Sequence, residues 1–297
     1  MRGAEPGASA VTTSVTFWGT RGTIPTPGPH TTRFGGNTAC VEVRDQSGQL
    51  VILDAGTGIR SLGRHLQEHA GPGGVQADIL VSHAHWDHIQ GLPYFAPFFR
   101  AGNVLRVWGP KQGDVGMEAI LKSLMQPEVF PVPLEALAAT LEVRHVDSEP
   151  FEARGCVITS MRVRHPSVTL GYRLAMSDGS TLVYVTDDEL SGGDYQVGHD
   201  WRRRFVAFIG GADLLVHDAT YTPEEYPRYT GWGHSTYAEA VDLAVEAGVK
   251  RLALFHHEPD HSDTALDEIA ERAQELAARR RGRLEVVAAA ESQQITL

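Results

Sequence analysis

The sequence is poor in cysteine, and its two cysteines, Cys40 and Cys156, lie in separate apolar, strand-like runs. A disulfide between them is the alternative, but we expect two buried, reduced thiols without notable reactivity. The chain also lacks any run of the roughly 18 to 20 apolar residues that a membrane-spanning helix needs. Its first thirteen residues contain no apolar stretch that could act as a signal peptide. These absences predict a cytoplasmic protein.

Positive charge is also scarce, since 26 lysines and arginines stand against 37 aspartates and glutamates and give a formal net charge of −11. A phosphate backbone is normally met by an excess of lysine and arginine, so a large nucleic acid is an unfavoured partner. The 42% hydrophobic and 21% charged composition is that of a globular protein. With no visible linker or repeat, we expect a disordered tail over residues 1–13 and a single domain over residues 14–297.

Short apolar runs rich in β-branched residues recur along the chain and predict strands. The expected strands span residues 15–18, 39–43, 50–53, 77–81, 104–108, 157–163, 169–174, 182–185, 214–216, 251–255 and 284–288.

Two segments in the later half of the chain have the three- and four-residue apolar spacing of amphipathic helices. One spans residues 264–279, and the other spans residues 236–247, where Thr236 and Glu239 are spaced as a capping box and Gly248 is placed to end the helix. Strands dominate the early half, and strands alternate with helices in the later half. This distribution favours an α/β fold in which two sheets form a sandwich with helices outside.

The segment 79–90 reads ILVSHAHWDHIQ, so three histidines and an aspartate directly follow an apolar strand. Two histidines separated by one residue can face one ion, while the carboxylate and the next imidazole can face a second. A polar loop with coincidental histidines is the alternative. However, His165, Asp187 and His256 also follow the carboxyl ends of expected strands, and sheet proteins collect their sites on such an edge. The pattern predicts a binuclear metal site.

The order HAHWDH, a lone histidine, an aspartate after a strand and a late histidine resembles the metallo-β-lactamase superfamily. The resemblance extends over about residues 15–288. The segments FWGTRGTIPTPGP, FGGNTAC, LDAGTG, HDATY and GWGHST are similar to the phosphodiesterase-like branch, which includes ribonuclease Z, the phosphonate-pathway phosphodiesterase and some cyclic-nucleotide phosphodiesterases. The resemblance implies an αββα sandwich of two mixed sheets flanked by helices.

The resemblance also implies seven metal ligands. One ion is assigned His83, His85 and His165, the other is assigned Asp87, His88 and His256, and Asp187 bridges the two. The neighbouring His257 competes with His256, which follows an apolar pair as the family ligand does. Zinc fits the histidine-rich set, although Mn2+ or Fe2+ could occupy the same donors. Two such cations would lower the pKa of a shared water, and Asp87 is placed to orient the resulting hydroxide for attack on a phosphodiester.

Further roles are expected around these ligands. His234, in GWGHST, matches the position where the ribonuclease Z branch places a histidine that stabilises or protonates the leaving group; a helix-capping surface histidine is the alternative. Asp218, in HDATY, stands where the branch usually has glutamate and could still orient His234. Asp54, in LDAGTG, is expected to support a ligand. Trp86 and Trp232 either wall the substrate pocket or are buried packing residues.

The substrate and the reaction remain open between several classes. Ribonuclease Z enzymes carry an arm for transfer RNA, whereas only 21 residues separate His165 from Asp187 and two strands occupy most of them. Together with the acidic charge, this favours a small phosphodiester such as a cyclic nucleotide or dinucleotide. Hydrolysis of an ester, thioester or lactone, and a non-catalytic metal-binding regulatory module, are the alternatives. A homodimer is expected by analogy alone.

Overall fold

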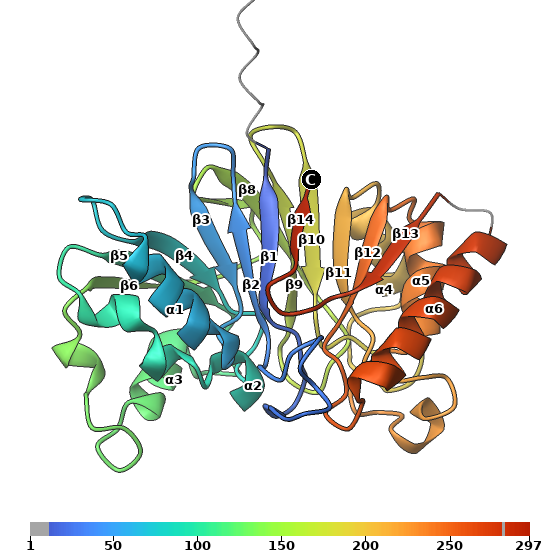
Figure 1. Cartoon of the computed structure of the whole chain (residues 1–297), viewed down its shortest axis with the longest axis horizontal. Helices are drawn as coiled ribbons and strands as arrows, with labels where there is room; N and C mark the ends of the chain where they lie inside the picture. Colours follow the sequence, from blue (N-terminus) through green and yellow to red (C-terminus); the bar gives the residue numbers. More distant parts are fainter. Residues whose placement is uncertain (1–11, 281–282) are drawn as a thin grey trace, which may run out of the picture.

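Two β-sheets packed face to face form the centre of the structure, a computed structural model that describes residues 12–280 and 283–297 (Figure 1). The first sheet contains, in spatial order, β14 (Gln294–Thr296), β1 (Ser14–Gly19), β2 (Cys40–Arg44), β3 (Leu50–Leu53), β4 (Gln76–Leu80), β5 (Val104–Gly109) and β6 (Thr140–His145). The second contains β13 (Glu285–Ala288), β12 (Arg251–Phe255), β11 (Leu214–Asp218), β10 (Thr181–Val185), β9 (Leu170–Ala175), β8 (Cys156–Arg162) and β7 (Phe151–Ala153).

Helices cover the outer face of each sheet. On the first sheet lie α1 (Gly58–Glu68), α2 (Trp86–Ile89) and α3 (Met117–Leu124), and on the second lie α4 (Trp201–Ile209), α5 (Tyr237–Glu246) and α6 (Asp263–Arg279) (Figure 1). The short 3-10 helices are η1 (Leu92–Tyr94), η2 (Ala96–Phe99), η3 (Leu134–Ala136) and η4 (Tyr226–Arg228). Each sheet mixes parallel and antiparallel pairs. The expected α/β fold, an αββα sandwich of two mixed sheets, is confirmed.

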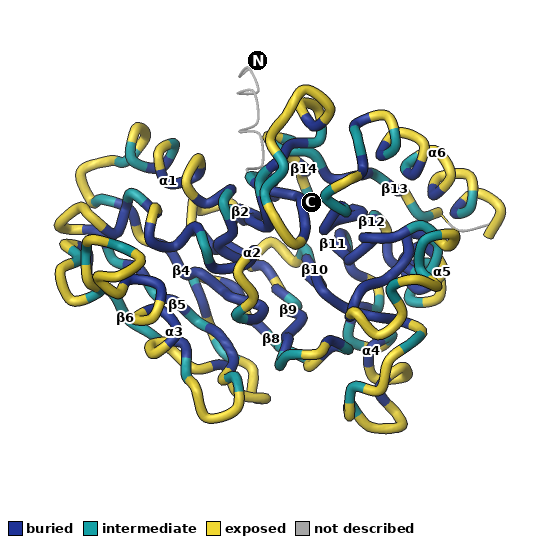
Figure 2. The backbone as a smooth tube through the Cα atoms, turned by 90° about the horizontal axis from the view of Figure 1, so that it is seen from below, coloured by how far each residue is buried: buried dark blue, intermediate teal, exposed yellow. Residues whose placement is uncertain are grey.

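The burial pattern explains why the strands could be recognised from the sequence. In β3, Val51 and Leu53 face the core between the sheets, while Leu50 and Ile52 face the core beneath α1 and α3. A strand covered on both faces reads as a continuous apolar run. Figure 2 shows the same arrangement, with buried strands at the centre and exposed turns around them.

The two expected helices are confirmed with their end signals. At the start of α5, the Thr236 hydroxyl accepts from the Glu239 N–H at 3.2 Å, and the Glu239 carboxylate accepts from the Thr236 N–H at 2.9 Å. Gly248 adopts a positive φ of 66° just beyond the helix, a conformation that favours glycine. The strands β6, β7 and β14 and the helices α1 to α4 were not predicted. Both β7 and β14 have only three residues, and β6 is a charged edge strand.

The remaining general predictions have mixed outcomes. Both cysteines are free and buried, as expected, and burial raises the pKa of Cys156 to about 11. The predicted tail falls outside the described residues up to residue 11, but Thr13 is buried and its hydroxyl donates to Asp178 at 2.8 Å. Within residues 12–280 and 283–297, no helix has the length and apolar character needed to cross a membrane. The cytoplasmic location, the single domain and the homodimer stay predictions.

Candidate metal centre

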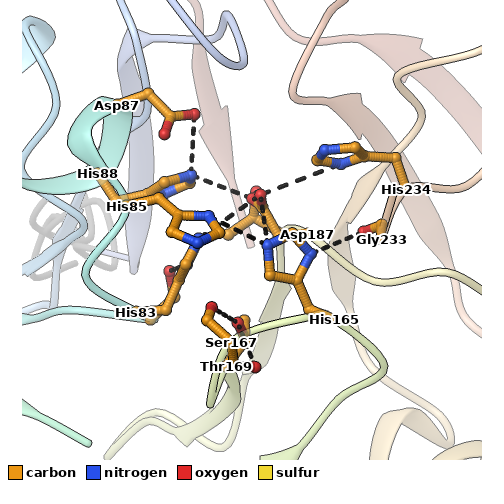
Figure 3. Close-up of polar contacts among 12 residues, drawn as sticks. His83, His85, Asp87, His88, His165, Ser167, Thr169, Asp187, Gly233 and His234 are labelled. Atoms are coloured by element: carbon orange, nitrogen blue, oxygen red, sulfur yellow. Dashed lines mark hydrogen bonds and ion pairs between the residues drawn. The ribbon is translucent and has the colours of Figure 1, made fainter. Parts of the chain in front are cut away.

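The predicted site residues lie where strands of both sheets end. His83 follows β4, and α2, which carries Asp87 and His88, begins three residues later. On the second sheet, His165 follows β8, Asp187 follows β10 and His256 follows β12. The packing of the two sheets brings these ends together around Asp187 (Figure 3).

One group of donors contains His83, His85, His165 and Asp187, whose ligand atoms all lie within 4.8 Å of one another. The Nε2 atoms of His83 and His165 each lie 3.7 Å from Asp187 Oδ1. His85 Nδ1 lies 3.2 Å from His165 Nε2. His85 is exposed to solvent, whereas the other three side chains are buried. This group is therefore open to solvent at His85.

A second group contains Asp87, His88 and His256. Asp87 Oδ2 lies 3.2 Å from the Nε2 atom of each of the two histidines. The same two Nε2 atoms lie 3.1 and 3.2 Å from Asp187 Oδ2. One oxygen of Asp187 thus faces the first group and the other faces the second, which is the arrangement expected of a bridging carboxylate.

The backbone at these strand ends is strained in a consistent way. Asp54, Asp187 and His256 have φ values of 58°, 53° and 61°, in the left-handed region that residues other than glycine rarely adopt. Such conformations cluster at functional sites because the surrounding structure holds them in place. Asp187 and His256 are members of the donor groups, and Asp54 accepts from the donor-group residue His88.

The hydrogen bonding and the pKa values of the donors also fit a site for divalent cations. Among the described residues, the buried Nε2 atoms of His83 and His88 have no hydrogen-bond partner, although buried polar atoms normally have one. Burial lowers the pKa of His83 well below its usual range and that of His165 to about 4, so both imidazoles are neutral, as metal ligands must be. Burial opposes protonation of His88 as well, but the carboxylates of Asp87, Asp187 and Asp54 together outweigh burial and raise the pKa of His88 well above its usual range. The carboxylates thus favour a cation at this position.

Asp54 supports the second group, as the sequence suggested. Its Oδ2 atom accepts from His88 Nδ1 at 2.8 Å and from the hydroxyls of Tyr184 at 2.7 Å and Ser82 at 2.8 Å, while Oδ1 accepts from the Ser82 N–H. All of these groups are fully buried. Because Nδ1 of His88 is held, its Nε2 atom is directed at Asp87 and Asp187.

His234 and Asp218 form a pair next to the centre. His234 Nδ1 donates to Asp218 Oδ2 at 2.7 Å, and the same nitrogen lies 4.0 Å from Asp187 Oδ1. The Thr220 and Ser235 N–H groups hold the other oxygen of Asp218. His234 is 9% exposed, so it is no surface cap. Its ring also lies within ligand range of Asp187 and His256.

The structure separates His256 from His257. His257 is buried, its Nε2 donates to the Ala289 carbonyl at 2.8 Å, and burial lowers its pKa to about 3. Only His256 reaches Asp87 and Asp187. The alternative that Trp86 and Trp232 are buried packing residues is wrong, because Trp86 is 68% exposed and Trp232 is 61% exposed.

Sequence reasoning missed three residues that shape the site, Gly22, Thr23 and Glu189. The Thr23 N–H donates to Asp87 Oδ2 at 2.7 Å, and Gly22 packs so closely on His256 that a Cβ atom there would lie 2.3 Å from Cε1 of the imidazole. Glu189, two residues after Asp187, accepts from the N–H groups of Gly231 and Gly233. The acidic run in VTDDEL was the available signal for Glu189, but a carboxylate with main-chain partners has no spacing pattern of its own.

Comparison with known proteins places this arrangement in a family. A sequence profile described as a beta-lactamase superfamily domain matches residues 49–257. Ribonuclease Z from Halobacterium salinarum is 29% identical over 289 residues, covering 83% of this chain and 87% of the relative.

Two solved structures share the fold across nearly the whole of both chains. The short form of human tRNase Z is 22% identical with a TM-score of 0.65, covering 95% of this chain and 98% of that chain. A diphosphatase from the PhnP family is 19% identical with a TM-score of 0.66, covering 96% of this chain and 98% of that chain. The superfamily and the hydrolase class predicted from the sequence are confirmed: the chain belongs to the beta-lactamase superfamily and has its metallo-β-lactamase fold.

Proposed function

We propose that this protein is a binuclear metal-dependent phosphodiesterase that acts on a small phosphodiester, such as a cyclic nucleotide or dinucleotide. The observation that carries the proposal is the position of Asp187 between two donor groups, with one carboxylate oxygen facing each. The ligands would be His83, His85 and His165 for one ion and Asp87, His88 and His256 for the other, with Asp187 shared.

Zinc is the proposed metal, because imidazole and carboxylate donors in these numbers suit it; Mn2+ or Fe2+ would find the same donors. When bound, such cations supply Lewis-acid activation of water and neutralise charge on the reacting phosphate oxygens. Asp87 would orient the attacking water, since its carboxylate is fixed by the Thr23 N–H and is directed at the centre.

His234 would donate the proton to the leaving oxygen. Burial disfavours its charged form, but the nearby carboxylates, Asp218 above all, together outweigh burial and raise the pKa of His234 to about 9. The imidazole is then protonated at neutral pH, with the Nδ1 proton held by Asp218 and the Nε2 proton left to donate. Asp218 acts through His234, which it orients and keeps charged.

A small substrate is supported by charge and by topology. The chain carries a net charge of −11, and the residues between His165 and Asp187 form the antiparallel strands β9 and β10. Maturation of transfer RNA is the second candidate, because the similar proteins include a ribonuclease Z and a tRNase Z. Esters, thioesters and lactones are further substrates that a centre of this kind could hydrolyse.

The test compares substrates on protein with a measured metal content. Hydrolysis of bis(p-nitrophenyl) phosphate and of cyclic nucleotides, lost with a chelator and restored by added zinc, is the expected result. Cleavage of a precursor transfer RNA with far higher kcat/KM than any small diester would replace the proposal with its second candidate. Full metal occupancy without turnover of any phosphodiester would contradict both and direct the search to thioesters, lactones or a binding role.

A further inference from the structure

Two tryptophans are exposed beside the metal centre. Large aromatic side chains are usually buried in a folded protein, yet Trp86 is 68% and Trp232 is 61% exposed. Trp86 lies between His85 and Asp87 in the chain, and Trp232 directly precedes Gly233 and His234. Exposed apolar groups that gather at a reactive centre are candidates for contact with a ligand.

The backbone at Trp86 is held by hydrogen bonds within α2 and at the neighbouring Asp87. Trp86 is the first residue of α2, and its carbonyl accepts from the Gln90 N–H at 2.7 Å. The next residue, Asp87, is held by the Thr23 N–H. The indole is therefore carried by a short, anchored helix and can meet a ligand with little loss of backbone entropy.

The backbone around Trp232 is held on both sides by one buried carboxylate. The N–H groups of Gly231 and Gly233 donate to Glu189 at 2.8 and 2.9 Å. Gly233 has a φ of 91°, and a Cβ atom there would lie 2.1 Å from His165 Nδ1. This turn therefore packs directly on His165, one of the proposed metal ligands. Trp232 thus stands on a rigid loop despite its exposure.

An aromatic ladder connects Trp232 with the proposed proton donor. The Trp232 ring meets Tyr229 edge-on with centroids 5.4 Å apart, Tyr229 stacks on Tyr221 at 4.5 Å, and Tyr221 meets His234 at 5.9 Å. In Figure 3 the segment of His85 and Asp87 and the segment of Gly233 and His234 lie on opposite sides of Asp187. The two chain segments that carry the exposed tryptophans therefore lie on opposite sides of Asp187.

Two arginines next to the site, Arg21 and Arg164, are held by contacts within the fold. Arg21 is fully buried, and its guanidinium donates to the carbonyls of Gly35 and His261. The Arg164 guanidinium donates to the Leu190 carbonyl and lies over the rings of Tyr195 and Trp201. These two guanidinium groups are therefore not free to bind a phosphate backbone, whereas the two indoles are exposed.

We infer that Trp86 and Trp232 determine specificity by stacking on flat aromatic groups on the two sides of the scissile phosphate. The substrate class is a small phosphodiester that carries an aryl or nucleobase group on each side. Because the segment that carries Trp232 also carries the proposed proton donor His234, Trp232 is assigned to the leaving group, and Trp86 is assigned to the group that stays on the phosphate. This inference rests on the proposed phosphodiesterase activity. Stacking accepts any base, because every base has a π face.

The test uses two substrates with the same leaving group, bis(p-nitrophenyl) phosphate and methyl p-nitrophenyl phosphate, on the metal-loaded protein. Trp232→Ala should raise KM about 10-fold for both, whereas Trp86→Ala should raise KM about 10-fold for the diaryl compound only. Phenylalanine at either position should restore most of the affinity. Val129→Ala, at an exposed apolar residue in the loop after α3, should leave both KM values unchanged. Unchanged KM values in both tryptophan variants, with turnover intact, would overturn the inference and leave the proposed function standing.

Calorimetry separates the inference from the proposed function. Binding of diphenyl phosphate and of dimethyl phosphate is measured on the wild type and on both alanine variants, without any need for turnover. The diphenyl compound should bind more tightly to the wild type, and each variant should lose about 10-fold in its affinity. Equal binding of both compounds, or unchanged binding in the variants, would refute the inference even if no diester were hydrolysed. If an alanine variant loses metal, the leucine variant at the same position replaces it. If a substitution at Trp86 or Trp232 converts a dimer to a monomer, that tryptophan contacts a second copy of the chain and the inference is overturned.

Discussion

The two sheets contribute to the metal centre in different ways. The first sheet delivers its donors in one short segment, His83 to His88, at the end of β4. The second delivers His165, Asp187 and His256 one at a time from the ends of β8, β10 and β12, and Asp218 from β11. The first contribution is a local motif, whereas the second exists only after parallel strands have been aligned. The second sheet therefore determines whether the motif of the first can hold two ions.

The largest effect is expected at His234, the proposed proton donor, which lies in the loop between β11 and α5. His234→Ala should lower kcat by about 10²- to 10⁴-fold for a cyclic nucleotide, whose leaving group is an alkoxide, because general acid catalysis is lost. The loss should be much smaller for bis(p-nitrophenyl) phosphate, whose leaving group needs no proton. Steady-state kinetics and elemental analysis measure this, with two metals per chain retained. Equal losses for both substrates, or loss of one metal, would indicate that His234 is a ligand.

Next in size is the support that the first sheet gives its own motif. Asp54→Asn should weaken metal binding by about 10- to 100-fold, because the carboxylate that fixes His88 Nδ1 is lost. Competition with a chromophoric chelator measures the affinity of the two sites. Glu42→Gln, at another buried carboxylate of the first sheet that accepts from Trp18, is the matched control and should bind both metals normally. Equal metal affinity in Asp54→Asn and the wild type would show that Asp54 does not support metal binding through His88.

A smaller effect is expected at the helices of the second sheet. Thr236→Ala removes the N-cap of α5, and Ser262→Ala removes that of α6. Each should lower the free energy of unfolding by about 1 kcal/mol. Urea denaturation measures both. Because Thr236 follows His234 by two residues, a loss of kcat in Thr236→Ala but not in Ser262→Ala would show that the cap also positions the proton donor.

The smallest effect compares the single thiol of each sheet. Burial raises the pKa of Cys156 in β8 to about 11 and that of Cys40 in β2 well above its usual range, so neither forms much thiolate at pH 8. A thiol-specific reagent should react slowly with the folded protein and rapidly with both thiols in denaturant. As the pH rises, the reaction rate of Cys156 should increase before that of Cys40. Fast reaction of Cys40 in the native protein would contradict its position in the core.

The same contrast explains what could be predicted from the sequence. The HAHWDH motif, the strands buried on both faces and the capped helices have periodic or local patterns, and they were found. The edge strands β6, β7 and β14 depend on a neighbouring strand for their existence, so their sequences carry little signal. His165, Asp187 and His256 were assigned through strand ends and through the resemblance, while Glu189 and Thr23 act through main-chain hydrogen bonds that no spacing encodes.

The central claim is that Asp187 joins the two donor groups into one binuclear phosphodiesterase centre. The most direct measurement is metal content by elemental analysis together with bis(p-nitrophenyl) phosphate hydrolysis, on the wild type and on Asp187→Ala. We expect two metals per chain and turnover in the wild type, and loss of turnover with fewer than two metals in the variant. A wild type that binds one metal, or a variant that keeps two metals and full turnover, would contradict the claim.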